Sequence, residues 1–167
     1  GKKEQAEQQF AEAERRIAPL AEQPSTGKTV AFFSITSNRL ATVRKGNDYV
    51  ARMIEMAGGD YGFADLTDNG NNLATVNLSL ENFYAGAKDA DVLIYNSTID
   101  GELTAIDELC AKNQLFADFK AVKEGNVWCT GKNMFQETMG LGNMIRDMNA
   151  VFADDTEYSF TYLHQLK

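Results

Sequence analysis

The chain has 167 residues, of which 44% are hydrophobic, and a formal net charge of −8. This length and composition favour one globular domain with a sizeable core. The acidic balance argues against a nucleic-acid partner and against a polybasic membrane contact, because both need a basic face.

The first segment is predicted to be a polar helix over residues 2–23. Its apolar residues recur at spacings of three and four, namely Ala6, Phe10, Ala13, Ile17 and Leu20. Charged residues flank this single apolar stripe, so we expect a connecting helix that lies on a domain surface. Because the sequence begins abruptly inside this helix, we expect the chain to be a fragment or a processed form.

From Lys28 onward, strands alternate with helices. Strands are predicted over 29–35, 41–43, 75–78, 91–95 and 127–129, and helices over 49–57, 80–87, 103–112, about 119–124 and 138–152. The continuous apolar run 29–35 is typical of a strand buried on both faces. Ser79 is a helix N-cap, and Gly58 follows a helix as a C-cap should. This alternation predicts a three-layer α/β/α sandwich with a mostly parallel sheet.

Residues for catalysis or metal binding are scarce in this sequence. The single histidine, His164, lies in the C-terminal tail, so a histidine-rich metal site cannot be built. Cys110 and Cys129 do not form a CxxC pair, and both a disulfide and two free thiols remain open. Gly27-Lys28-Thr29 resembles the end of a phosphate-binding loop, but Glu22 stands where that motif needs a glycine. We therefore expect a binding protein without a resident cofactor or metal, and not an enzyme.

Polar loops follow three of the predicted strands, at 36–39, 96–98 and 130–136. In open α/β sheets, ligands bind beyond the carboxyl ends of the strands. The loops contain amides, hydroxyls, one guanidinium and one aromatic ring, which suit a bulky, partly polar ligand. The candidate ligand-binding residues are Asn38, Arg39, Tyr95, Asn96, Thr98, Asn133, Phe135 and Gln136.

A structural role remains open for several of these residues. Asn96 would then cap a turn, Tyr95 would belong to the core, and Arg39 would be a solvated loop charge. Trp128 lies within a predicted strand, and we expect it in the core.

Three motifs, in this order and spacing, resemble a known family over about residues 28–152. They are the run from Arg44 to Gly59 (RKGNDYV…IEMAGG), the run from Ser79 to Ile94 (SLEN…ADVLI), and the run from Phe119 to Trp128 (FKAVKEGNVW). They are similar to the C-terminal lobe of helix-hinged substrate-binding proteins of ABC importers for ferric siderophores, haem and vitamin B12.

The resemblance implies two α/β lobes joined by one long helix, with the ligand between the lobes. Residues 2–23 would then be the end of that interlobe helix and residues 28–167 the C-terminal lobe, with the N-terminal lobe absent from this chain. The protein would be extracytoplasmic, as a periplasmic or cell-surface lipoprotein, with its lipid anchor on the missing N-terminal part. The resemblance also implies that Glu81 docks onto arginines of the membrane permease; a first-turn helix carboxylate is the structural alternative.

The chain departs from the family pattern in two places. Ala90-Asp91 replaces the common Pro-Asp, and the loop 133–136 lacks the basic cluster that a strongly anionic siderophore would need. Arg39 and Arg44 remain as sources of positive charge. Two other readings stay open, namely a lobe of a chelatase-like or nitrogenase-like α/β enzyme and a purely structural interaction domain.

Overall fold

The computed structural model describes residues 1–21, 25–66, 73–131 and 140–167. The elements, in chain order, are α1 (Lys2–Ala21), β1 (Lys28–Ile35), β2 (Ala41–Arg44), α2 (Tyr49–Met56), β3 (Gly59–Tyr61), β4 (Thr75–Leu78), α3 (Leu80–Ala87), β5 (Val92–Tyr95), α4 (Ile106–Lys112), the 3-10 helix η1 (Gln114–Asp118), α5 (Lys120–Lys123), β6 (Val127–Thr130), α6 (Gly140–Phe152) and β7 (Leu163–Gln165). Among these described residues, no helix is both long and apolar enough to cross a membrane.

The described strands form one seven-stranded sheet. Its main path runs β4-β2-β1-β5-β6-β7, and β3 pairs with the first half of β1. The centre is parallel, because β1, β5 and β6 run in one direction. Antiparallel pairing occurs toward both sides, between β1 and β2, β2 and β4, and β6 and β7. The predicted α/β class with its parallel core is therefore confirmed.

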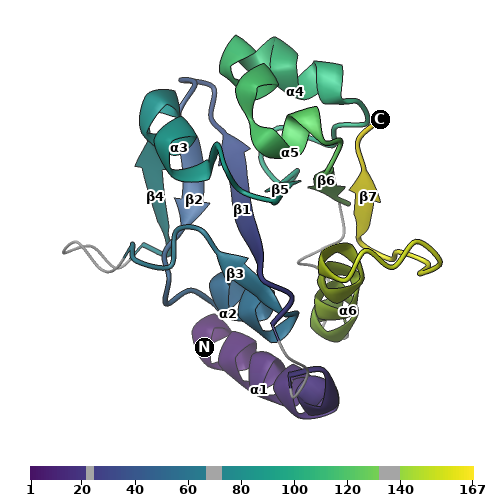
Figure 1. The fold of residues 1–167 in the computed structure, drawn as a ribbon. Coiled ribbons are helices and arrows are strands. Elements are labelled where there is room, and N and C mark those ends of the chain that lie inside the picture. The colour runs from purple at the N-terminus through teal and green to yellow at the C-terminus, as the bar shows by residue number, and fades with distance from the viewer. Residues whose placement is uncertain (22–24, 67–72, 132–139) are drawn as a thin grey trace.

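Helices cover both faces of the sheet. Helices α1, α2 and α6 contact one another, whereas α3 and α4 each contact η1, which also contacts α5. The two groups lie on opposite sides of the sheet (Figure 1). This arrangement gives the three layers that the alternation of strands and helices predicts.

An aromatic cluster joins the sheet to the α3 side. The ring of Phe33 on β1 lies 4.7 Å from Phe83 on α3, 5.6 Å from Phe116 on η1 and 5.6 Å from Tyr95 on β5. Successive strand residues face opposite sides, so Phe32 points toward the other group of helices. Both phenylalanines are essentially inaccessible, as expected for a strand buried on both faces.

The predicted helix start at Ser79 and the predicted helix end at Gly58 agree with the structure, and Asp48 caps a second helix. The Asp48 carboxylate accepts from the Val50 N–H at 3.0 Å at the start of α2, and the Ser79 hydroxyl accepts from the Asn82 N–H at 3.2 Å at the start of α3. Gly58, just after α2, has a φ of 90°, a conformation that favours glycine.

The C-terminal tail is a strand where the sequence analysis expected none. β7 pairs antiparallel with β6, and the buried carboxylate of Asp147 on α6 holds the segment that leads into it. Asp147 accepts from the backbone N–H groups of Thr161, Tyr162 and Leu163 at 2.6–3.2 Å and from the Tyr158 hydroxyl at 2.8 Å. A buried charge needs such donors, and here they fix the tail against α6.

Candidate ligand-binding edge

The parallel strands define two edges of the sheet. We call the edge where β1, β5 and β6 end the carboxyl edge, and the edge where they begin the amino edge. β4 runs in the same direction as β1, because two antiparallel pairings separate them. The N-terminus of α3, which follows β4, therefore also lies at the carboxyl edge.

The loop after β1 presents Asn38 and Arg39 to solvent. Thr36 organises this loop, because its carbonyl accepts from the Arg39 N–H at 2.9 Å and its hydroxyl accepts from the Leu40 N–H at 3.1 Å. Arg39 has a φ of 61°, which is uncommon for a residue other than glycine. Backbone strain of this kind occurs often at binding sites.

The loop after β5 is held by two pairs of hydrogen bonds. The side-chain oxygen of Asn96 accepts from the Thr98 N–H at 3.1 Å and from the Thr98 hydroxyl at 2.8 Å. Ser97 contacts Thr130 at the end of β6 through its N–H, at 2.9 Å, and through its hydroxyl, at 3.1 Å. Asn96 is only 6% exposed, so it shapes the turn, as the structural alternative predicts, and Thr98 is the exposed member of the pair.

Tyr95 lies in the core rather than on the binding surface. Its exposed fraction is 0%, and its ring packs edge-on against Phe33. Burial raises the pKa of its hydroxyl. Tyr95 is therefore a core residue, as the structural alternative predicts, and does not lie where it could contact a ligand directly.

Arg44 ends β2 one position beyond the Phe33–Val43 pair, beside the middle of β1, because β2 runs antiparallel to β1 and away from the carboxyl edge. Its guanidinium lies 3.6 Å from the Asp48 carboxylate and 5.7 Å from the centre of the Tyr49 ring. Arg44 is therefore set back from the carboxyl-edge loops, and its guanidinium is paired with Asp48.

Asn133, Phe135 and Gln136 lie outside the described residues. The strand that leads to them, β6, ends at Thr130 at the carboxyl edge, and the Gly131 N–H donates to the Tyr162 carbonyl at 2.6 Å. Trp128 within β6 is 9% exposed and packs 4.7 Å from the Phe160 ring, which confirms its core role.

Ile99 and the neighbouring ion pair were not predicted from the sequence. Ile99 is 63% exposed, and Asp100 beside it pairs with Lys112 on α4. Burial alone would lower the pKa of Lys112, but the hydrogen bond to Asp100 and nearby charges raise it overall. The sequence signal that could have identified Ile99 is its position as the one apolar residue in the polar loop 96–101.

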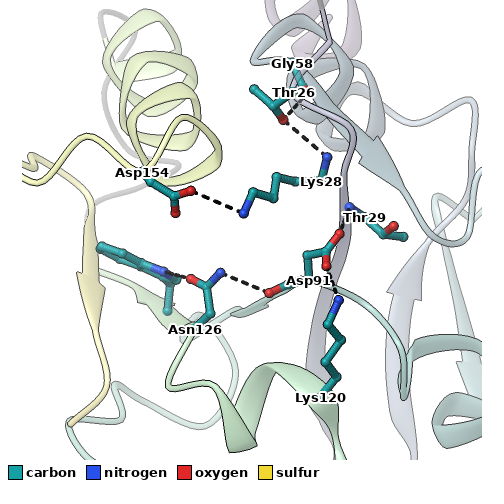
Figure 2. Close-up of polar contacts among 9 residues, drawn as sticks. Thr26, Lys28, Thr29, Gly58, Asp91, Lys120, Asn126 and Asp154 are labelled. Atoms are coloured by element: carbon teal, nitrogen blue, oxygen red, sulfur yellow. Dashed lines mark hydrogen bonds and ion pairs between the residues drawn. The ribbon is translucent and has the colours of Figure 1, made fainter.

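A polar network ties strands and helices together at the amino edge (Figure 2). The Asp91 carboxylate accepts from the Thr29 N–H at 3.0 Å and from the Lys120 ammonium at 2.5 Å, and the Asp91 carbonyl accepts from the Asn126 side chain at 3.0 Å. The hydrogen bond from Lys120, followed by that from Thr29, lowers the pKa of Asp91. These bonds join Asp91 to Thr29 on β1, to Lys120 on α5 and to Asn126 before β6. Asp91 therefore has a structural role.

A shallow hollow lies close to this network at the amino edge. It is lined by Tyr84, Lys88, Asp89, Asp118, Lys120, Lys123 and Glu124. Its three lysines and three carboxylates balance, and Lys120 is already used by Asp91. The carboxyl edge is therefore the better candidate, because it combines exposed polar groups, an exposed apolar side chain and an outlying backbone conformation.

His164 and Cys129 both contact the backbone of Leu103. His164 Nε2 lies 2.6 Å from the Leu103 carbonyl oxygen, and the Cys129 thiol contacts the Leu103 N–H at 3.4 Å. Both cysteines are free thiols, and burial raises the pKa of Cys129 to about 11, which keeps it protonated. No group of three or more candidate metal ligands occurs within the described ranges.

Comparison with solved structures identifies the fold. The chain is similar to a TroA-like periplasmic binding protein, FepB, from Veillonella parvula (TM-score 0.66, 13% identity, 96% of this chain and 55% of that one). It is also similar to an ABC-type Fe3+-hydroxamate transport protein from Saccharomonospora viridis (TM-score 0.65, 17% identity, 88% and 49%) and to the periplasmic heme-binding protein RhuT from Roseiflexus sp. RS-1 (TM-score 0.56, 26% identity, 90% and 53%).

Sequence comparison adds one relative. An uncharacterized lipoprotein of Methanocaldococcus jannaschii is 38% identical over 95 residues, which are 56% of this chain and 21% of that protein. No family model matches the chain.

The chain therefore has the fold of the helix-hinged, TroA-like periplasmic binding proteins of ABC importers. It spans about half the length of the solved structures that it resembles.

Proposed function

We propose that this chain is the C-terminal lobe of an extracytoplasmic solute-binding protein that serves an ABC importer. Its ligand is a metal chelate or corrinoid of the ferric-siderophore, haem or cobalamin type, held between this lobe and a second one. Residues 2–23 are then part of the interlobe helix. The names of the similar structures, which include an Fe3+-hydroxamate transport protein and a heme-binding protein, support this ligand class.

One observation carries the proposal, namely that the polar loops converge on the carboxyl edge. Asn38, Arg39 and Thr98 are exposed there on loops that follow neighbouring parallel strands. Ligands of open α/β sheets bind at such edges. One edge provides only one wall of a site, which agrees with a chain of about half the length of its structural neighbours.

The position of Glu81 supports a docking role. It is exposed in the first turn of α3, and α3 begins at the carboxyl edge. A permease that faces the mouth of the interlobe cleft would therefore meet this carboxylate. The same carboxylate also complements the helix dipole, and this contribution is compatible with docking.

The proposal includes an extracytoplasmic location, with a lipid anchor outside this chain. The periplasmic neighbours and the lipoprotein relative support this location. The partners are then the permease subunits and the chelate.

Ligand binding by the intact polypeptide that contains this chain tests the proposal. The protein would be heated with a ferric hydroxamate, haem or cyanocobalamin, and with the iron-free hydroxamate as the matched control. A ligand at one hundred times its Kd stabilises the folded state by about 2.7 kcal/mol, which gives a clear rise in Tm. If none of the three raised the Tm, the proposed ligand class would be wrong.

A further inference from the structure

The side chain of Ile99 is an exposed apolar group at the candidate site. Two large hydrophobic residues among the described ones are well exposed, Leu73 at 65% and Ile99 at 63%. Leu73 precedes β4, whose first residue, Thr75, pairs with Arg44, three positions before Leu78 at the carboxyl edge. Ile99 is thus the one that lies at the carboxyl edge, next to Thr98.

The loop that carries Ile99 is fixed on both sides. Asn96 holds Thr98 through two hydrogen bonds, and the Gly101 N–H donates to the Ser97 carbonyl at 3.0 Å. Lys112 anchors Asp100, the residue after Ile99. A side chain on such a preorganised loop loses little further freedom when a ligand covers it.

The charges near Ile99 do not favour a polyanion. Asp100 and Lys112 neutralise each other, and Arg39 is an exposed cation on the loop after β1. The described loops of the carboxyl edge therefore present little positive charge, and the whole chain has a net charge of −8. A trianionic chelate would require several paired cations at its binding surface.

We propose that this lobe selects a chelate of low net charge with an apolar periphery, and that Ile99 contacts the apolar surface of that ligand. This inference rests on the proposed function and narrows its ligand class. A neutral ferric tris-hydroxamate or a neutral corrinoid meets the requirement, and a trianionic ferric tris-catecholate does not. Arg39 can pair with one weakly anionic group on the ligand edge.

Calorimetric titration of the intact protein tests the charge preference. The probes are a neutral ferric tris-hydroxamate, cyanocobalamin and a trianionic ferric tris-catecholate. We expect one of the two neutral probes to bind at least about tenfold more tightly than the catecholate, and its Kd to change little with added salt, because little charge is screened. Tighter binding of the catecholate would overturn the inference and leave the proposed function intact. Failure of these three probes and of haem to bind would overturn the proposed function itself, and the inference with it.

Substitutions at Ile99 test the contact. Ile99→Ser removes apolar surface from the interface and is expected to weaken binding of the preferred neutral probe about tenfold or more, whereas Ile99→Leu retains affinity. Leu73→Ser, with a similar degree of exposure away from the carboxyl edge, is the matched control and leaves affinity unchanged. Unaltered affinity in Ile99→Ser, with a Tm like that of the unsubstituted protein, would show that Ile99 does not contact the ligand.

Discussion

The side-chain oxygen of Asn96 accepts two hydrogen bonds from Thr98, at 3.1 Å from its backbone N–H and at 2.8 Å from its hydroxyl. This pair converts the end of β5 into a defined turn. It also explains why Asn96 is buried although it was a candidate ligand contact. At the proposed ligand site, we therefore expect Asn96 to act indirectly, through the position of Thr98 and Ile99.

Replacement of Asn96 tests this positioning role. Asn96→Ala removes the acceptor of both bonds and is expected to lower the free energy of unfolding by about 1–2 kcal/mol in urea denaturation. Asn96→Asp keeps an acceptor and costs less. Asn38→Ala, at an exposed loop position, is the control and stays within about 0.5 kcal/mol of the unsubstituted chain. A cost for Asn96→Ala no larger than that of the control would contradict the role.

Glu81 is expected to separate uptake from ligand affinity. Glu81→Gln removes the charge that we assign to permease docking, so import of the labelled ligand by cells or proteoliposomes should fall severalfold. The Kd should not change, because Glu81 lies on α3 and not on the loops after β1 and β5 that we assign to the ligand. Helix α3 loses about 0.3–1 kcal/mol of dipole stabilisation. Glu124→Gln, an exposed carboxylate at the amino edge, serves as the control for uptake. A weaker Kd with normal transport per bound ligand would refute the docking assignment.

Asp91 is expected to make the fold sensitive to acid. The hydrogen bonds from Lys120 and from the Thr29 N–H hold the pKa of Asp91 below its ordinary value. A lowered folded-state pKa stabilises the fold above the unfolded pKa, and this stability is lost as the pH falls through the folded pKa. Asp91→Asn should therefore cost about 1 kcal/mol or more at neutral pH. It should also reduce the loss of unfolding free energy between about pH 6 and pH 3.

The cation side of this pair provides a second test. Lys120→Met removes the largest cause of the lowered pKa of Asp91, so the acid-dependent loss should shrink in this variant as well. If the free energy of unfolding depended equally on pH in the unsubstituted chain and in both variants, protonation of Asp91 would not be coupled to folding.

Tyr158 is expected to give the opposite dependence at alkaline pH. Burial, and then the hydrogen bond to the Asp147 carboxylate, raise the pKa of Tyr158 to about 12 from an ordinary value of 10.0. The folded state favours the neutral phenol. The contribution of Tyr158 to the free energy of unfolding is therefore complete below its unfolded-state pKa and is lost as the pH rises through its folded-state pKa. Tyr158→Phe should cost about 1 kcal/mol at neutral pH and flatten the decline of unfolding free energy above about pH 10. Parallel declines in the two proteins would contradict this.

Local signals predicted most of the secondary structure. The caps at Asp48 and Ser79 and the stop at Gly58 act within a few residues, so the sequence around them suffices. The strands β3 and β7 were missed because each is three residues long and exists through pairing with a distant strand. Such pairing leaves little trace in the local pattern.

The candidate site was predicted less completely, for two physical reasons. Strand direction decided the place of Arg44, because an antiparallel β2 runs from the carboxyl edge back toward the middle of β1. Burial decided the role of Tyr95, because a strand apolar on both faces does not reveal which of its residues lie beneath the loops. The convergence of the loops after β1 and β5 was predictable, since parallel strands end at the same edge.

The position of the bound metal tests the proposed site most directly. Crystals of the intact protein would be grown with a neutral ferric hydroxamate, and the iron located by its anomalous scattering. We expect the iron peak between the lobes, facing the loops 36–40 and 96–101, with Ile99 against the chelate. An iron peak at the amino edge, beside Lys88 and Lys123, would contradict the assignment of the carboxyl edge as the ligand site.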